Sequence, residues 1–251
     1  MIEEYYNRGG EVERLFRDRT NYIEYATTMK YLTAYLADSV TVLDCCAGGG
    51  VYAFPLAELG YKVTAGDLVQ LHVDILNSSD KRHLLTDVYK GDVRDMSRFG
   101  DETFDSMLCL GALYHLFTEG DRTQCVRECL RVLKNGGIFM FAYINRNAVF
   151  INHFVNNFDI EIDNGILKDG VNGEFYTMNF GESDKLMSGF DVARLTNVGV
   201  DGLRYPFADR INSVSDDEFN AYMRYHYATC EEPSIIGHSM HGLWIGRKGI
   251  L

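Results

Sequence analysis

One stretch, residues 41–68, constrains the fold of this chain more than any other: TVLDCCAGGGVYAFPLAELGYKVTAGDL. An apolar, β-branched run over residues 40–46 leads into three glycines, a helical segment over residues 51–59, and a second apolar run that ends on Asp67. A strand, a glycine-rich loop and a helix in this order are typical of a βαβ unit that holds a nucleotide at the helix N-terminus. The sequence therefore predicts an α/β fold.

Strand-like and helical segments continue to alternate along the chain, with a helix expected from Asp121 to Leu133. A capping box at Ser215–Glu218 predicts a later helix that runs to about Thr229. Alternation of this kind implies right-handed crossovers, so we predict a doubly wound, seven-stranded, mostly parallel sheet in a Rossmann-like fold. The expected strands lie at residues 40–46, 62–66, 88–93, 104–110, 138–144, 192–200 and 242–247.

The flanking segments predict additions to a single domain that spans residues 1–251. Residues 1–37 are expected to form a helical lid, because their tyrosines give an aromatic face. Residues 145–190 and 204–234 are expected to form a small helical and aromatic cap, inserted around the last strands. With 46% hydrophobic residues, the chain has ample material for the core of such a domain.

The charge balance restricts the partners that we expect. The chain carries 36 acidic and 24 basic residues, for a net charge of −12. Nucleic-acid binders usually show a basic surface, so nucleic acid is disfavoured and a small-molecule substrate is favoured. No 18-residue apolar run and no signal peptide are evident, so we expect a cytoplasmic protein without a membrane partner. The sequence leaves the oligomeric state open.

The six cysteines predict neither a disulfide framework nor a metal centre. They occupy positions 45, 46, 109, 125, 129 and 230 and include no C-x-x-C pair. Three lie in apolar strand-like runs, which favours buried thiols. The histidines and acidic residues near the C-terminus likewise lack an established ligand spacing, so no metal is expected.

The glycine loop itself leaves two ligands to compare. Residues 48–53, GGGVYA, fit the loose pattern G-x-G-x-x-G/A of NAD sites. Asp44 opposes NAD, because a carboxylate at the end of the first strand would face a pyrophosphate on the first helix. S-adenosylmethionine carries a sulfonium and an ammonium instead of phosphates, so Asp44 would attract it.

These residues resemble the motifs of class I S-adenosylmethionine-dependent methyltransferases. VLDCCAGGG is similar to the first motif, acid-x-Gly-x-Gly-x-Gly, with Cys46 in the first glycine place. Asp67 matches the acid that holds the ribose hydroxyls, and residues 91–93 (GDV) resemble the motif that meets the adenine. Residues 110–115 (LGALYH) resemble the motif under the methionine moiety, and residues 133–137 (LKNGG) the turn before the fifth strand. The resemblance covers about residues 27–145.

The resemblance implies a cofactor site and its residues. The resemblance implies that Asp92 binds the adenine amino group and that a neighbouring backbone N–H binds the adenine ring. It also implies that a threonine of the lid binds the methionine carboxylate. The implied cofactor contacts are Tyr25, Thr28, Asp44, Cys46, Ala47, Gly48, Gly50, Asp67, Leu68, Asp92, Val93, Leu110 and Gly111.

The acceptor would lie beyond the transferable methyl group, near the ends of the fourth and fifth strands. His115 is the candidate general base by position and type. Tyr114 and Tyr143 are candidates to orient a substrate hydroxyl, and His226 is a candidate cap residue that contacts the substrate. Each also has a structural interpretation: His115 could bond to backbone, and the tyrosines could belong to the core.

Four functions therefore stand beside one another. A methyltransferase that acts on a small molecule is the leading hypothesis. The alternative is modification of a tRNA wobble uridine, because residues 145–158 and 230–233 look similar to segments of bacterial tRNA carboxymethoxyuridine methyltransferases. A catalytically silent binding module is opposed by the presence of Asp44, Asp67 and Asp92, and an NAD-dependent reductase by Asp44. The sequence does not identify the acceptor atom.

Overall fold

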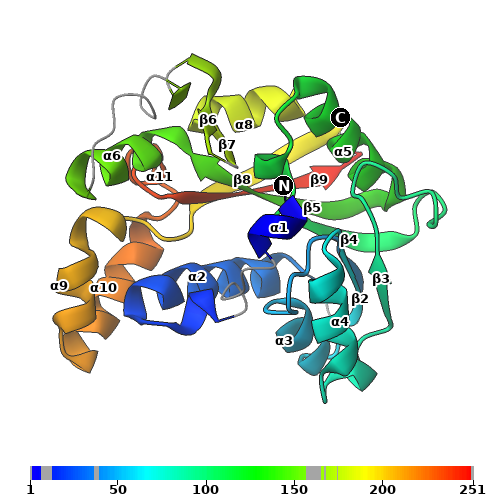
Figure 1. Ribbon diagram of the computed structural model, residues 1–251, viewed down its shortest axis with the longest axis horizontal. Helices are drawn as coiled ribbons and strands as arrows, with labels where there is room; N and C mark the ends of the chain where they lie inside the picture. The colour runs from blue at the N-terminus through cyan, green and yellow to red at the C-terminus, as the bar shows by residue number, and fades with distance from the viewer. Residues whose placement is uncertain are drawn as a thin grey trace.

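The structure is a computed structural model that describes residues 2–6, 13–36, 40–156, 165–166, 168–173 and 175–249. Within these ranges, a nine-stranded sheet lies between two layers of helices (Figure 1). The strands are β1 (Thr41–Asp44), β2 (Lys62–Asp67), β3 (Asp87–Lys90), β4 (Phe104–Cys109), β5 (Leu133–Asn145), β6 (Val171–Asn172), β7 (Phe175–Met178), β8 (Val192–Gly199) and β9 (His241–Lys248).

The central part of the sheet has the predicted doubly wound, mostly parallel arrangement. Strands β3, β2, β1, β4 and β5 are parallel neighbours in that order, with β1 between β2 and β4. Strand β9 runs antiparallel to β5, and β8 runs antiparallel to β9. These seven strands confirm the predicted sheet. Strands β6 and β7 form a short hairpin, and β7 pairs with the end of β5. This hairpin was not predicted.

The helices differ from the prediction mainly at their ends. They are α1 (Ile2–Tyr6), α2 (Arg19–Tyr35), α3 (Ala53–Glu58), α4 (Gln70–Ser78), α5 (Glu119–Val132), α6 (Arg146–Asn156), α8 (Phe180–Met187), α9 (Ala208–Ser213), α10 (Asp216–Thr229) and α11 (Pro233–Ile236), with 3-10 turns η1 (Arg14–Phe16), η2 (Arg82–Leu84), η3 (Leu113–His115) and η4 (Tyr205–Phe207). Thr118, and not Asp121, caps α5, because its side chain accepts a hydrogen bond from the Asp121 amide. The capping box of Ser215 and Glu218 is confirmed.

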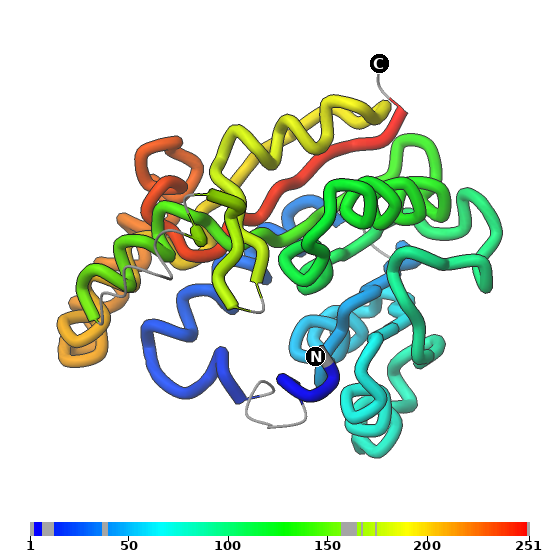
Figure 2. Tube along the Cα trace, turned by 45° about the horizontal axis from the view of Figure 1, so that its top comes forward, coloured from blue at the N-terminus to red at the C-terminus, as the bar shows by residue number. Residues whose placement is uncertain are grey.

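The N-terminal segment is not one continuous helix. The structure places α1, η1 and α2 there, and Asp18 begins α2 by accepting a hydrogen bond from the Asn21 amide. Residues 1, 7–12 and 37 of the predicted lid lie outside the described residues, as do residues 157–164, 167 and 174 of the predicted cap. The elements α6, α9 and α10 from the two predicted cap segments gather at one end of the sheet in both views (Figures 1 and 2). The division into lid and cap stays a prediction.

The core forms on both faces of the sheet. Helices α2, α3 and α4 cover one face, where Leu32, Leu56 and Leu76 pack against the strands (Figure 1). Helices α5 and α8 cover the other face, where Trp244 and Phe141 stack at 5.3 Å between ring centroids. This sandwich holds the carboxyl ends of β1, β2 and β4 in fixed positions at one edge. Among the described helices, none combines the length and the apolarity needed to span a membrane.

Candidate active site

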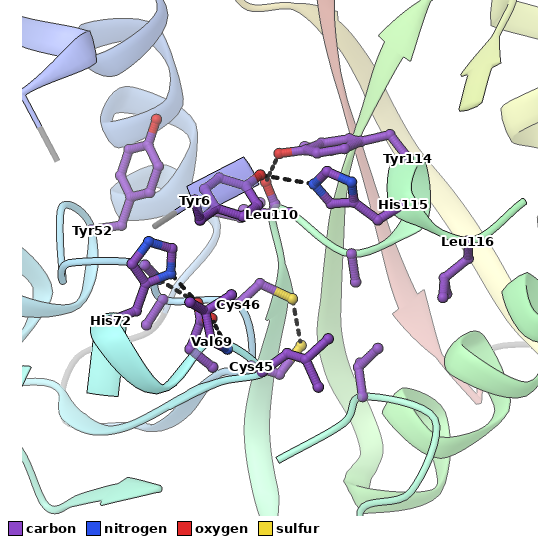
Figure 3. A pocket seen from close by; sticks show the side chains of 18 of the residues that line it. Tyr6, Cys45, Cys46, Tyr52, Val69, His72, Leu110, Tyr114, His115 and Leu116 are labelled. Atoms are coloured by element: carbon purple, nitrogen blue, oxygen red, sulfur yellow. Dashed lines mark hydrogen bonds and ion pairs between the residues drawn. The ribbon is translucent and has the colours of Figure 1, made fainter. Parts of the chain in front are cut away.

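A cavity of about 420 Å³ lies at the carboxyl ends of β1, β2 and β4. This is the edge at which open, doubly wound sheets bind ligands, and the volume suits a small-molecule site. Most of the predicted site residues line it (Figure 3). They are Thr28, Cys46, Ala47, Gly48, Asp67, Leu68, Asp92, Val93, Leu110, Gly111, Tyr114 and His115.

The glycine loop has the shape that its sequence requires. Gly48 and Gly50 take φ angles of +53° and +89°, in the left-handed region that favours glycine. A Cβ on Gly50 would lie 2.5 Å from the Phe54 ring, so this glycine serves loop packing and does not line the cavity. Cys46 avoids the left-handed region, because Glu102 is the only described non-glycine residue with a positive φ. A cysteine therefore fits the first glycine place of the motif.

Asp44, at the end of β1, is a buried carboxyl without a partner. The residue is 1% exposed, and neither carboxylate oxygen has a side-chain or backbone donor within hydrogen-bond geometry among the described residues. Burial raises the pKa of Asp44 well above its usual range, and the charges of Cys46 and Asp67 act in the same direction, against a smaller opposing effect of the Cys46 backbone. An unpaired buried carboxyl is unfavourable, and a cationic ligand in the adjoining cavity would compensate for it. The site therefore fits S-adenosylmethionine and opposes a pyrophosphate.

Asp67 is fixed at the end of β2 by two backbone donors. The Gly48 amide donates to its Oδ2 at 2.8 Å, and the Val69 amide donates to its Oδ1 at 2.8 Å. The Nδ1 of His72, on α4, lies 3.1 Å from Oδ1 without the alignment of a hydrogen bond. The carboxylate thus has the rigid placement that a ribose-binding acid needs. His72 lines the cavity and was not predicted from the sequence.

Asp92 lies on the cavity wall in an ion pair. Arg94 Nη2 lies 2.6 Å from Asp92 Oδ2, and Arg94 Nη1 lies 2.9 Å from Asp121 Oδ1. The hydrogen bonds from Arg94 lower the pKa of Asp92 and keep it ionised. An ionised acceptor beside Val93 suits recognition of an amino group such as that of adenine. Arg94 and Asp121 also line the cavity and were not predicted.

His115 lies in η3, beside the other end of the cavity. Its side chain is buried, and its Nε2 lies 2.7 Å from the hydroxyl oxygen of Tyr6 in α1 (Figure 3). Tyr114, next to it, donates a hydrogen bond from its hydroxyl to the Leu110 carbonyl at 3.3 Å. The structure therefore brings a titratable imidazole and two phenols together at the cavity wall. Tyr6 was missed because it comes from a segment remote in sequence.

A second hollow of about 220 Å³ adjoins the first. The two share Tyr6, Arg14, Tyr114 and His241 in their walls. Aromatic rings dominate the second hollow, which Tyr5, Tyr6, Tyr114, Phe175 and Tyr205 line. Asn152 and His153 add polar groups, and the buried Nδ1 of His153 has no hydrogen-bond partner among the described residues.

A buried charge network forms the wall between the two hollows. Arg14 donates to both carboxylate oxygens of Glu24, at 2.8 and 2.9 Å. His241 Nδ1 lies 2.9 Å from Asp201 Oδ2 and 3.3 Å from Glu24 Oε2. Despite the desolvation of Glu24, the charges of His241 and Arg14 lower its pKa. Arg14, Glu24 and His241 face the cavity, and sequence reasoning did not single them out as site residues.

Five predicted residues, Asp44 among them, do not line the cavity. Gly50, described above, is another. Ala142 faces the cavity, and Tyr143 therefore points to the opposite face of the sheet, because successive residues of a strand alternate. There it is fully buried and donates a hydrogen bond to Asn197 Oδ1 at 3.0 Å. His226 is buried with its Nε2 2.9 Å from Thr27 Oγ1, and burial lowers its pKa to about 4. Tyr25 stacks on Tyr52 at 5.9 Å between ring centroids. In the structure these side chains contact other parts of the protein, and their expected ligand contacts stay a prediction.

Comparison with known proteins identifies the central segment. A family model described as a methyltransferase domain matches residues 43–141. A glycine/sarcosine N-methyltransferase of Aphanothece halophytica is 31% identical over 110 residues, which are 43% of this chain and 42% of that protein. A ubiquinone biosynthesis O-methyltransferase of Vibrio parahaemolyticus is 29% identical over 166 residues, which are 65% of this chain and 67% of that protein. The chain thus spans about two fifths of the length of the first of these relatives.

Solved structures share the fold at low sequence identity. A protein of Pyrococcus horikoshii superposes with a TM-score of 0.65 at 16% identity, covering 98% of this chain and 99% of that chain. A putative sarcosine dimethylglycine methyltransferase of Galdieria sulphuraria gives a TM-score of 0.57 at 16% identity, covering 90% and 85%. At this identity the likeness establishes the arrangement of helices and strands alone.

Proposed function

This chain belongs to the class I S-adenosylmethionine-dependent methyltransferases, and we propose that it transfers the cofactor's methyl group to a small-molecule acceptor. The observation that carries the proposal is the buried, unpartnered carboxyl of Asp44 beside a cavity of about 420 Å³. A cationic cofactor gives that carboxyl a counter-charge, which a phosphate-bearing cofactor does not.

Each part of the cofactor would meet a different set of residues in the cavity. Asp67 would hold the ribose hydroxyls, because two backbone donors already fix its carboxylate. Asp92 and Val93 would meet the adenine, and Thr28 from α2 would contact the methionine carboxylate. When bound, the cofactor supplies an electrophilic methyl group on its sulfonium. The protein then needs only to orient a nucleophile behind that carbon and exclude water.

The second hollow supports a small acceptor. Its volume of about 220 Å³ and its aromatic walls suit a compact molecule. Related proteins carry names for small-molecule reactions, glycine/sarcosine N-methylation and ubiquinone biosynthesis O-methylation. The net charge of −12 also favours such an acceptor over a polyanion. The tRNA alternative stays a hypothesis from sequence, and no contact described above favours it.

His115 would act as the general base for acceptors that carry a proton. It lines the first hollow next to Tyr114, which lines both, and its Nε2 lies 2.7 Å from the Tyr6 hydroxyl. A hydroxyl or ammonium acceptor would give its proton to the imidazole, directly or through Tyr6. A preformed anion would need no base.

Two measurements test the proposal. Calorimetry should detect binding of S-adenosylmethionine and S-adenosylhomocysteine but not of NAD, and Asp67→Asn should weaken both, since a charge-assisted hydrogen bond contributes roughly 1.5–3 kcal/mol. A labelled-methyl assay should then find acceptors among small metabolites and not in tRNA. Binding of NAD with no binding of S-adenosylhomocysteine would refute the cofactor assignment. Methylation of tRNA with a steep salt dependence would refute the acceptor class.

A further inference from the structure

Five of the six cysteines gather beneath the cofactor cavity, although their spacing in the sequence shows no metal motif. Cys45 and Cys46 directly follow β1, and Cys109 ends the neighbouring strand β4. The two strands pair in parallel with Asp44 opposite Leu108, so the next residues, Cys45 and Cys109, come side by side. Cys125 and Cys129 lie one turn apart on α5, which packs over β4.

The sulfur atoms form two triads that share Cys109. The Sγ atoms of Cys45, Cys46 and Cys109 all lie within 4.8 Å of one another, and so do those of Cys109, Cys125 and Cys129. The Cys45–Cys46 distance is 3.5 Å, and the Cys109–Cys125 distance is 3.8 Å. A zinc–sulfur bond is about 2.3 Å, so three thiolates around one ion lie about 4 Å apart. Each triad already has nearly that spacing.

The surroundings of these sulfur atoms also suit a cation. Asp44 and Asp67 interact electrostatically with Cys46. Thiolates are the preferred ligands of soft metal ions, and nearby carboxylates add attraction.

We propose that Cys45, Cys46 and Cys109, named here the thiol triad, bind one thiophilic metal ion such as Zn²⁺, Cd²⁺ or Cu⁺. The ion replaces the three S–H protons, which leave to solvent through the cavity. Cys45 and Cys46 line that cavity and give the ion a path, whereas Cys125 and Cys129 are fully buried. The oxygen and nitrogen cluster of Glu24, Asp201 and His241 is a weaker candidate, because Arg14 and Arg204 already balance its carboxylates.

An ion in the thiol triad would compete with the cofactor. Cys46 lies in the cavity wall against Gly111, and a Cβ added to Gly111 would lie 3.3 Å from the Cys46 Cβ. The wall therefore has little room for both an ion with its ligand shell and a bound cofactor. Metal binding itself does not depend on the proposed function, because it needs only the three thiols.

The test is a titration of the reduced, full-length protein with Cd²⁺ in the presence of a weak competing chelator. The readout is the ultraviolet thiolate-to-cadmium charge-transfer band. We expect one equivalent to bind to the wild type, with a matching rise in melting temperature. Cys45→Ser, Cys46→Ser and Cys109→Ser should each remove this band. Cys230→Ser is the matched control and should keep it, because Cys230 lies apart, 3.3 Å from the Tyr31 hydroxyl.

Each result decides the proposal. The absence of the band in the wild type overturns the proposal. A band that survives Cys45→Ser and Cys46→Ser but is lost in Cys125→Ser also overturns it, because that result assigns the ion to the triad of Cys109, Cys125 and Cys129. Circular dichroism checks folding of each variant, and Cys46→Ser, at the cavity surface, decides if the buried variants do not fold. Cadmium should also weaken S-adenosylhomocysteine binding at least tenfold. If the protein does not bind S-adenosylhomocysteine at all, the proposed function fails while the cadmium band still tests the thiol triad.

Discussion

The unpartnered carboxyl of Asp44 predicts that cofactor binding is linked to a proton. Burial raises the pKa of Asp44 in the free protein, so the carboxyl holds a proton at a pH where exposed aspartates do not. A bound ammonium or sulfonium favours the ionised form. Binding must therefore expel the proton, and affinity must rise as pH rises until the pKa of the free protein is passed.

The magnitude follows from linkage. Below the pKa of the free protein and above that of the complex, affinity should change about tenfold per pH unit, because one proton is released. Asp44→Asn keeps the size of the side chain but cannot ionise. We expect this variant to lose a charge-assisted interaction of roughly 1.5–3 kcal/mol, which is about 10- to 150-fold in affinity, and to lose the pH dependence as well.

The assay is isothermal titration calorimetry with S-adenosylhomocysteine, which shares the ammonium but cannot react. Measurements in buffers of different ionisation enthalpy give the number of protons released. Asp67→Asn is the matched control, since it should weaken binding while keeping the proton release. Equal affinity of Asp44→Asn and wild type, or no proton release in the wild type at any pH, would refute the reasoning.

Three further predictions concern catalysis and stability. His115→Ala should lower turnover ~10²–10⁴-fold with cofactor affinity unchanged, as measured by steady-state kinetics and calorimetry, and a wild-type rate would show that no base is needed. The pKa of His226 is about 4 in the folded protein against an ordinary value of 6.5, so the unfolded chain takes up the proton first as pH falls. The free energy of unfolding should therefore fall by roughly 3 kcal/mol as pH falls through this window. Urea denaturation should show a shallower fall for His226→Gln. Gly50→Ala should lower the melting temperature more than Gly48→Ala, because both have positive φ but only at Gly50 would the Cβ meet Phe54; equal losses would mean that backbone strain, of about 1–3 kcal/mol, acts alone.

The sheet was predictable because each central strand is marked by local composition. Residues 41–44, 62–67 and 104–109 are apolar runs bounded by turn residues, and the acids at the ends of β1 and β2 follow directly from the motif. The hairpin β6–β7 was missed because its strands are short and lack alternation.

The acceptor side was harder to predict because its residues meet only in three dimensions. Tyr6, Arg14 and His241 come from both ends of the chain, and no spacing in the sequence brings them to His115. Tyr143 illustrates a different limit. A chemically suitable residue near the end of a strand still has even odds of facing the wrong side, and here Ala142 takes the cavity face.

Tyr6 contacts both ends of the reaction chamber at once. Its ring packs against His72, beside Asp67, at 5.2 Å between centroids, and its hydroxyl meets His115. The same short helix thus covers the place where the cofactor must arrive and the place where the acceptor must lose its proton. We therefore expect an order of events in which the cofactor binds first, α1 assembles the His115 pair over it, and the acceptor follows. Product-inhibition kinetics should accordingly show a compulsory sequence in which S-adenosylhomocysteine leaves last and competes with S-adenosylmethionine alone.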